Sequence, residues 1–174
     1  MPAFAFAIAR WLAVRLPPTI HPMILHFPIV LLYLAVPLEF LALWWPNRDG
    51  FLRRAAFWTV TLACGAIIVT MAAGFVSEQS VHWTPTTAVI LGHHQLLAML
   101  TGTFAGLGWL AHMGGRVPRS QRWGLFGRGK GGLLSAVLIL VAAVFVTLTA
   151  HLGGEMVYQY GVGVAGVSRQ VPAA

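Results

Sequence analysis

The chain has 174 residues, of which 58% are hydrophobic and only 9% are charged, and its mean hydropathy is +0.78. A soluble domain carries roughly 25% charged residues, so this composition excludes an ordinary soluble protein and predicts an integral membrane protein. The net charge of +7 does not indicate nucleic-acid binding, because the basic residues lie in short connections between apolar segments. The length suits one domain of about four membrane spans, at roughly 20 residues each.

Residues 3–16 are apolar but interrupted by Arg10 and Arg15. This segment is too short and too charged to span a membrane comfortably, so we expect an interfacial helix on the outer surface. A fifth span is the alternative. The chain is accordingly divided into an N-terminal arm (residues 1–20), a transmembrane domain (residues 21–164) and a C-terminal tail (residues 165–174).

Four longer apolar segments predict four membrane-spanning helices, at about residues 22–45, 55–76, 86–114 and 133–151. The first opens at His21-Pro22, and proline suits the first turn of a helix. The fourth reaches at least His151, where Gly153 and Gly154 either bend the helix or end it. The sequence therefore predicts an all-α, four-helix transmembrane bundle with up-down-up-down topology.

The basic residues predict the orientation of this bundle. Eight of them lie in the two connections that join spans one and two and spans three and four: Arg48, Arg53, Arg54, Arg116, Arg119, Arg122, Arg128 and Lys130. Four tryptophans lie near the same ends of the spans, as in an interfacial aromatic belt: Trp44, Trp45, Trp58 and Trp109. The positive-inside rule then predicts a multi-pass protein of the bacterial inner membrane with both termini in the periplasm.

Six of the seven histidines are expected near the outer ends of the spans: His21, His26, His82, His93, His94 and His151. Imidazole is costly to place in hydrocarbon without a partner, so polar side chains at membrane depth are functional candidates. Neutral imidazole is also the commonest metal ligand among side chains. The pattern predicts a haem or metal site between helices near the outer face.

Spans one and three are diagonal in such a bundle, about 12–14 Å apart, which suits two histidines facing a central haem iron. By helical rise, His26 lies about 6 Å and His94 about 11 Å below the starts of their helices. We therefore expect His26 and His94 to be the axial pair. Adjacent residues point about 100° apart, so His94 rather than His93 is expected to face inward. A second site would combine His151 with His21 or His93.

Structural roles compete with these functional ones. His21 could be a plain interfacial cap, His82 is expected to be solvated, and His112 at the cytoplasmic end is most simply interfacial. The spacing Gly102-x-x-x-Gly106 suits either a surface that lines a flat macrocycle or close helix packing, and packing is favoured.

Two carboxylates are further candidates. Glu39 lies within span one, where it either serves a proton relay or a quinone contact or, as we favour, extends toward Arg53 or Arg54. Glu155 lies one helical turn after His151 and either orients that imidazole or is solvated.

Three sequence stretches resemble a known family: HPMILHFPI at residues 21–29, HLGGEMVY at 151–158 and GVGV at 161–164. They resemble a bacterial family of four-span membrane proteins called domain of unknown function 2231, over about residues 18–164. In that family a histidine also begins the third span, which corresponds here to His94. Members often carry an acidic residue directly after a Gly-Phe pair; here Glu78 comes three residues after Phe75. Relatives occur fused to iron–sulfur or cytochrome-type carriers, which implies a redox role.

Three functions compete on these grounds. The first is a b-type cytochrome-like electron-transfer protein with one or two haem b groups and redox partners in the membrane or periplasm. The second is a non-catalytic accessory subunit of a larger membrane redox complex, and the third is a site for a Cu, Zn or Fe ion. No constellation typical of a stand-alone enzyme is evident. The candidate ligands for haem iron or another metal are His26, His94, His151 and His21.

Overall fold

A computed structural model describes residues 20–45, 50–114 and 130–164 of the chain. Its elements are α2 (Ile20–Ile24), α3 (His26–Trp44), α4 (Phe51–Ser77), the short 3-10 helix η1 (Glu78–Ser80), α5 (Pro85–Gly114) and α6 (Lys130–Tyr158). Four stretches are long and apolar enough to cross a membrane: Ile20–Trp44, Phe51–Ser80, Pro85–Met113 and Gly132–Tyr158. The expected all-α membrane protein with four spanning helices is confirmed. The expected N-terminal interfacial helix lies outside the described residues.

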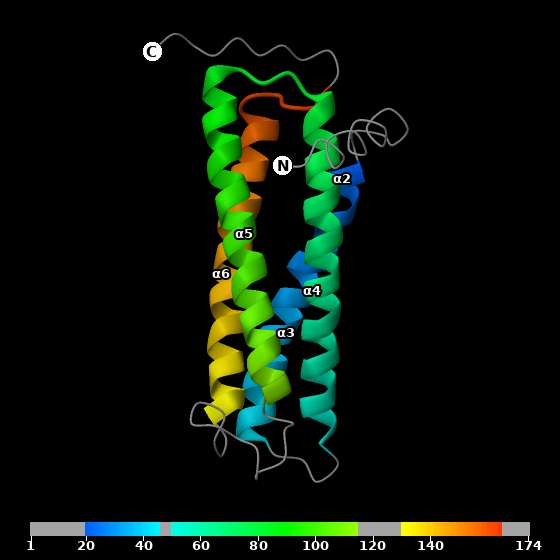
Figure 1. Ribbon diagram of the computed structural model, residues 1–174, viewed down its shortest axis with the longest axis vertical. Helices are drawn as coiled ribbons and strands as arrows, with labels where there is room; N and C mark the ends of the chain where they lie inside the picture. Colours follow the sequence, from blue (N-terminus) through cyan, green and yellow to red (C-terminus); the bar gives the residue numbers. More distant parts are fainter. Residues whose placement is uncertain (1–19, 46–49, 115–129, 165–174) are drawn as a thin grey trace.

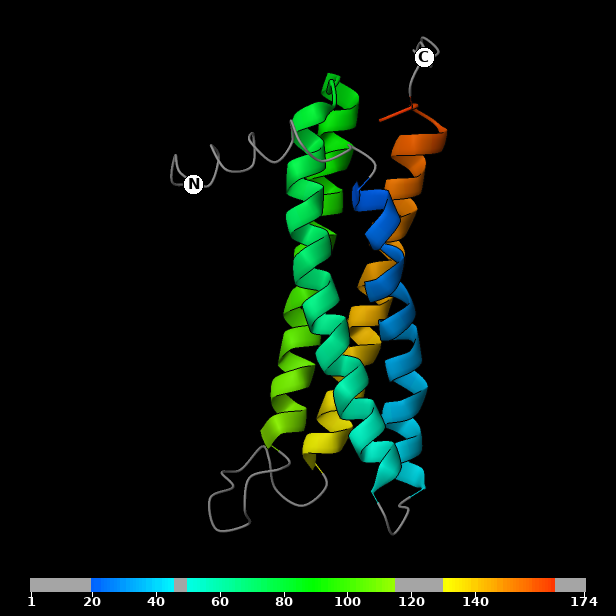
Figure 2. The ribbon, with the colours of Figure 1, turned by 90° about the vertical axis from the view of Figure 1, so that its right-hand side faces the viewer.

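The four long helices lie side by side along one axis, and consecutive helices run in opposite directions (Figures 1 and 2). Helix α3 packs against α4 and α6, and α5 packs against the same two helices, most extensively against α6. Helices α3 and α5 are therefore diagonal partners that run in the same direction. Residues at equal positions along these two helices lie at similar depths in the bundle.

The hydrogen bonding of the first span is interrupted at Leu25, between α2 and α3, although Leu25 keeps helical dihedral angles, so the helical phase carries through. Pro28 lies four residues after Ile24, has no backbone N–H and would clash with the carbonyl of that residue in a regular helix. The missing bond accounts for the break. Helix α2 thereby becomes a separate turn that lies against α4.

Helix α6 continues through Gly153 and Gly154 to Tyr158, so these glycines do not end the helix. Glycine in a helix interior costs only about 1 kcal/mol relative to alanine. The packing of α6 along α5 outweighs this cost.

Small residues on the inner faces of the helices allow close packing. Two buried clusters form the core: Leu32, Ala63, Ile67, Ala105, Ala142 and Val146, and next to them Ala35, Val60 and Ile139. Large apolar side chains such as Phe27 and Trp58 are exposed on the outer surface, where lipid would cover them. Trp109 differs from the other tryptophans of the expected belt, because its indole N–H donates to Thr61 Oγ1 at 3.0 Å.

A pair of glycines on α5 provides a test of this packing. An alanine Cβ at Gly108 would lie 2.8 Å from Cδ1 of Ile139, whereas one at Gly106 would have no contact within 4 Å. Ile139 is fully buried and cannot move aside freely. We expect Gly108→Ala to lower the free energy of unfolding by about 1–3 kcal/mol, measured by denaturant titration in detergent. Gly106→Ala should be neutral or slightly stabilising, and equal losses in the two variants would contradict the helix contact.

Candidate functional site

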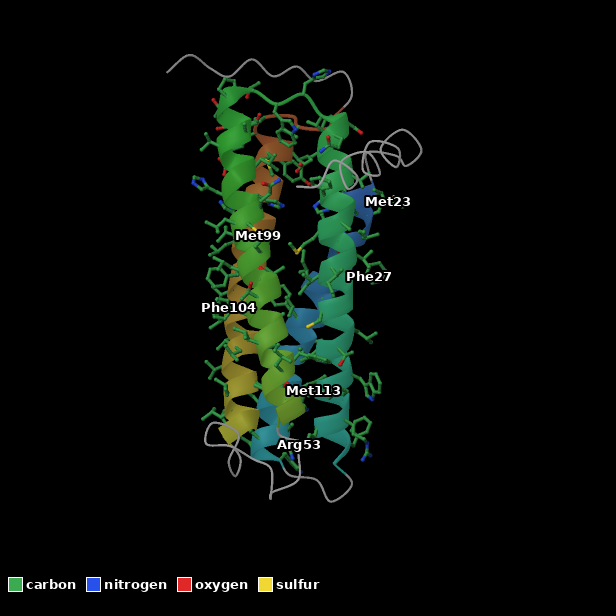
Figure 3. All side chains as sticks on the ribbon, viewed as in Figure 1. Met23, Phe27, Arg53, Met99, Phe104 and Met113 are labelled. Atoms are coloured by element: carbon green, nitrogen blue, oxygen red, sulfur yellow. The ribbon has the colours of Figure 1, made fainter. Side chains whose placement is uncertain are left out.

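The structure brings two of the predicted histidines together near one end of the bundle. His21 lies in α2 and His94 in α5, on the two diagonal spans. Their ring centroids are 6.4 Å apart, and the ring planes meet at 77°. Met23 is labelled near this end in Figure 3, whereas Met113 and Arg53 lie toward the opposite end. The two rings form a pair, here called the histidine pair.

Both imidazoles are held by backbone carbonyls through the same ring nitrogen. Nδ1 of His21 lies 3.0 Å from the carbonyl oxygen of Thr70 on α4, and Nδ1 of His94 lies 2.9 Å from that of Thr149 on α6. A carbonyl oxygen accepts only, so each Nδ1 must carry the proton and donate it. In the neutral rings, each Nε2 then keeps a free lone pair. This is the tautomer in which imidazole binds a metal through Nε2.

Two glycines on the flanking helices make room for the rings. An alanine Cβ at Gly74 of α4 would lie 3.1 Å from Cε1 and from Nδ1 of His21. One at Gly153 of α6 would lie 3.3 Å from Cε1 of His94. Any larger residue at either position would therefore displace an imidazole.

His26, the expected axial partner of His94, is exposed and is not part of the histidine pair. Pro28 and Leu32 of α3 are buried and mark the inner face of span one. His21 lies seven residues before Pro28, about two full turns, and so falls on that face. His26 lies two residues before Pro28, about 200° away, and falls on the opposite side. The diagonal is the expected one, but His21 replaces His26 on it.

His151 is also exposed, although it lies on the same helix as the carbonyl that holds His94. Gly153 faces His94, and a residue two positions earlier lies about 200° away around the helix. His93 is exposed as well, whereas His94 faces inward as expected. Across the described ranges, no three His, Cys, Asp or Glu side chains are grouped closely enough to hold a metal ion. The site therefore has two imidazoles, where three helices were expected to contribute one each.

The carboxylates near this end have other partners. Glu78 accepts a hydrogen bond from Nε2 of Gln95 at 2.7 Å, and Gln95 directly follows His94. Within the parts of the chain that the structure describes, Glu155 forms neither a side-chain hydrogen bond nor an ion pair with His151. Among the described residues there is therefore no contact through which Glu155 could orient His151, as had been expected. For the paired histidines, backbone carbonyls do the orienting instead.

An open groove of about 470 Å³ lies between α4 and α5, and its lining begins five residues along α5 from His94. Its lining is almost entirely apolar: Cys64, Ile67, Ile68, Met71, Met99, Gly102, Thr103 and Gly106. Met71 directly follows Thr70, whose carbonyl holds His21. Gly102 and Gly106 line this space and bring no neighbouring backbone within 4 Å of their Cβ positions. Gly106 therefore only lines the groove, whereas Gly102 lines it and also packs against Ile67, whose side chain would lie 3.4 Å from an added Cβ. Gly108 makes the tightest contact, with Ile139.

A second buried polar cluster lies toward the opposite end, and the sequence analysis did not find it. Oε1 of Glu39 accepts hydrogen bonds from Nδ1 of His112 and from Oγ of Ser135, each at 2.9 Å. All three side chains are buried. His112 is thus buried rather than interfacial, and the carboxylate of Glu39 bonds to His112 and Ser135, although Arg53 of α4 borders the same small cavity. One feature of the sequence could have indicated that His112 is buried. It lies eighteen residues, or five full turns, after His94, so the two histidines share one face of the helix.

A scan against protein-family models matches residues 17–166 to a family described as a predicted membrane protein, DUF2231. Comparison with curated proteins gave no match, and neither did comparison with solved structures. The family match covers most of the chain, including all four spans and the histidine pair. The chain therefore belongs to the DUF2231 family of membrane proteins.

Proposed function

We propose that this protein is a membrane electron-transfer protein of the b-type cytochrome kind, with a haem held between His21 and His94. One observation carries the proposal: two imidazoles on diagonal spans, each tied through Nδ1 to a backbone carbonyl and each with its Nε2 free. Within the described residues, neither Nε2 has a hydrogen-bond partner.

The spacing of the rings fits a shared metal. A metal–imidazole bond is about 2.0–2.1 Å long, and the ring centre lies about 1.1 Å behind the ligating nitrogen. Two imidazoles on opposite sides of one metal therefore have ring centres about 6.2–6.4 Å apart. The observed separation is 6.4 Å. Rings in plain edge-to-face contact have centroids about 4.5–7 Å apart, so the spacing agrees with a shared metal without excluding direct ring contact.

The surroundings also suit a flat, largely apolar group. Metal-bound histidines almost always donate their second ring nitrogen to a carbonyl or carboxylate, which fixes ring orientation. Here Thr70 and Thr149 supply those acceptors. The groove of about 470 Å³ between α4 and α5, which neither histidine lines, is within the usual size range of cofactor and ligand sites, about 300–1,000 Å³. The two imidazoles and this nearby apolar space support the proposal of a haem.

Haem, when bound, supplies one-electron redox chemistry, and the protein supplies ligation, burial and orientation. The positive-inside rule supports an orientation in a bacterial inner membrane with both termini periplasmic, and the histidine pair would then lie toward the periplasmic side. A redox protein of the membrane or periplasm is the corresponding partner. The described residues contain one such pair of imidazoles, which favours one haem over two.

The direct test is the absorption spectrum of the full-length protein purified in detergent after expression with haem supplied. We expect a Soret band and, after reduction, the sharp visible bands of a six-coordinate, low-spin haem at one haem per chain. A colourless protein under these conditions would contradict the proposal. Elemental analysis of the same sample measures bound iron, copper and zinc directly.

A directly bound metal ion is the second candidate, and one observation favours it. The sulfur-containing side chains of Met71 and Met99 line the groove between α4 and α5. Thioether and imidazole ligands together suit copper, particularly Cu(I). A colourless protein with one copper per chain would support this candidate over haem. A protein with neither pigment nor metal would leave the third function, a non-catalytic accessory subunit.

The glycines beside the rings provide a test of the geometry that leaves both histidines in place. In Gly74→Ala and Gly153→Ala, the new methyl group would displace the ring of His21 or His94. Changes in residues that orient ligands typically lower metal affinity about 10–100-fold, and we expect a loss of this size, measured by haem titration. Gly92→Ala is the matched control, because its Cβ would meet nothing within 4 Å. Equal affinity in all three variants would contradict the ring positions.

A further inference from the structure

The buried cluster of Glu39, His112 and Ser135 has a feature that packing alone does not explain. One carboxylate oxygen of Glu39 accepts two hydrogen bonds, and Nδ1 of His112 takes part in one of them. The other ring nitrogen of His112, Nε2, is buried and has no hydrogen-bond partner among the residues that the structure describes. His112 is only 7% exposed, and the ring of Phe57 lies against it at 5.4 Å.

An unpartnered buried polar atom costs about 1–3 kcal/mol, so a structural role would favour apolar residues or a fully bonded pair. The Nε2 atom instead belongs to a side chain that lines a cavity. This cavity measures about 20 Å³ and is bordered by Glu39, Ala42, Leu43, Arg53, His112 and Gly132. A volume of this size holds one water molecule.

A buried water needs two to four polar partners. The lining offers three candidates: the imidazole of His112, the carboxylate of Glu39 and the guanidinium of Arg53. Arg53 lies in the first turn of α4 and is exposed, and Figure 3 shows it at the end of the bundle. A water in the cavity would therefore connect the buried pair with the aqueous surface.

We propose that Glu39 and His112 form a proton-exchange site, reached from the Arg53 end of the bundle through a single water molecule in this cavity. A proton from the water binds Nε2 of His112, and the water regains one from the surface. The resulting imidazolium keeps its Nδ1–H on the carboxylate of Glu39. Release reverses these steps, so one proton is exchanged per chain and no electron moves.

The groups around His112 agree with this role. Helix α3 contributes the carboxylate of Glu39, α4 contributes Arg53 and the apolar ring of Phe57, and α6 contributes the hydroxyl of Ser135. The carboxylate of Glu39 accepts from Nδ1 of the ring, and Arg53 is the charged group at the exposed end of the cavity. The site is independent of the histidine pair, which lies toward the other end of the bundle.

The test is nitrogen NMR of the full-length protein, labelled with ¹⁵N-histidine and placed in lipid nanodiscs, between about pH 5 and pH 9. The His112 ring signals are those missing from His112→Gln, or, if that variant does not fold, those displaced in Glu39→Gln. We expect these signals to change with pH in the wild-type protein and this change to differ in Glu39→Gln, where the carboxylate that accepts from Nδ1 is gone. Signals that stay constant over the whole range would identify a sealed structural pair and overturn the proposal.

The route is tested by filling the cavity. In Ala42→Leu the larger side chain takes the place of the water, and we expect exchange of the His112 ring protons with solvent to slow by about tenfold or more. Val89→Leu, on an exposed surface of α5, is the control and should leave the exchange rate unchanged. Equal exchange rates in Ala42→Leu and the wild-type protein would overturn the route through this cavity.

Discussion

The His94→Ala variant is expected to lose its haem, with affinity at least about 100-fold below that of the wild-type protein. The expectation follows from the two-ligand site, because the described residues offer no third imidazole that could take over. His21→Ala should lose haem to the same extent. Loss of a coordinating residue should lower haem affinity at least as much as loss of a residue that orients a ligand, which typically lowers metal affinity about 10–100-fold. Haem titration followed by the Soret band measures the effect.

His26→Ala and His93→Ala are the matched controls for this experiment. Each removes the same side chain from the same pair of spans, but both imidazoles are exposed on the outer surface. Both control variants should keep full haem content. Loss of haem in His26→Ala with retention in His21→Ala would show that the ligand on span one is His26, contrary to the geometry.

The second large effect is expected on stability. In Glu39→Ala, Nδ1 of His112 and Oγ of Ser135 lose their common acceptor inside the bundle. Removal of one partner from a buried pair costs about 3–5 kcal/mol in soluble proteins. Hydrogen bonds between membrane helices are worth less, about 0.6–2 kcal/mol each. Two lost bonds and the vacated volume together predict a loss of about 3 kcal/mol in the free energy of unfolding.

Denaturant unfolding in detergent measures this loss, with Glu155→Ala as the control. Glu155 is half-buried, so its removal should change the free energy of unfolding by less than about 0.5 kcal/mol. The double variant Glu39→Leu/His112→Phe replaces both polar partners with apolar groups and should recover most of the stability. A Glu39→Ala protein as stable as the control would contradict the buried network.

The spans and the family could be predicted from the sequence because each depends on local pattern. About 20 consecutive apolar residues suffice to identify a membrane helix, whatever its neighbours are. The first predicted segment agrees with α2 and α3 together, and the other three agree with α4, α5 and α6, of which α4 and α6 extend several residues further than predicted. The break at Leu25 also has a local cause in Pro28, but its consequence, a separate turn that carries His21 against α4, is tertiary.

The inward-facing histidine on each span was harder to predict, because the histidines of one helix cannot be told apart until its buried face is known. On span one, His21 and His26 differ by five residues, or about 140° around the helix, so at most one can face the core. Depth below the start of the helix, calculated from the rise per residue, favoured His26. The buried face, marked by Pro28 and Leu32, selects His21.

The spacing of residues along the chain determined which polar side chains share a helix face, which composition does not indicate. His21 and Glu39 are eighteen residues apart, and so are His94 and His112. Eighteen residues are five full turns, about 27 Å, so each pair of positions shares one helix face. Only the tertiary structure decided that these two faces meet, because it packs the first and third spans as diagonal partners that run in the same direction. That arrangement joins His21 with His94 toward one end and Glu39 with His112 toward the other, contacts between residues 73 positions apart that no local pattern specifies.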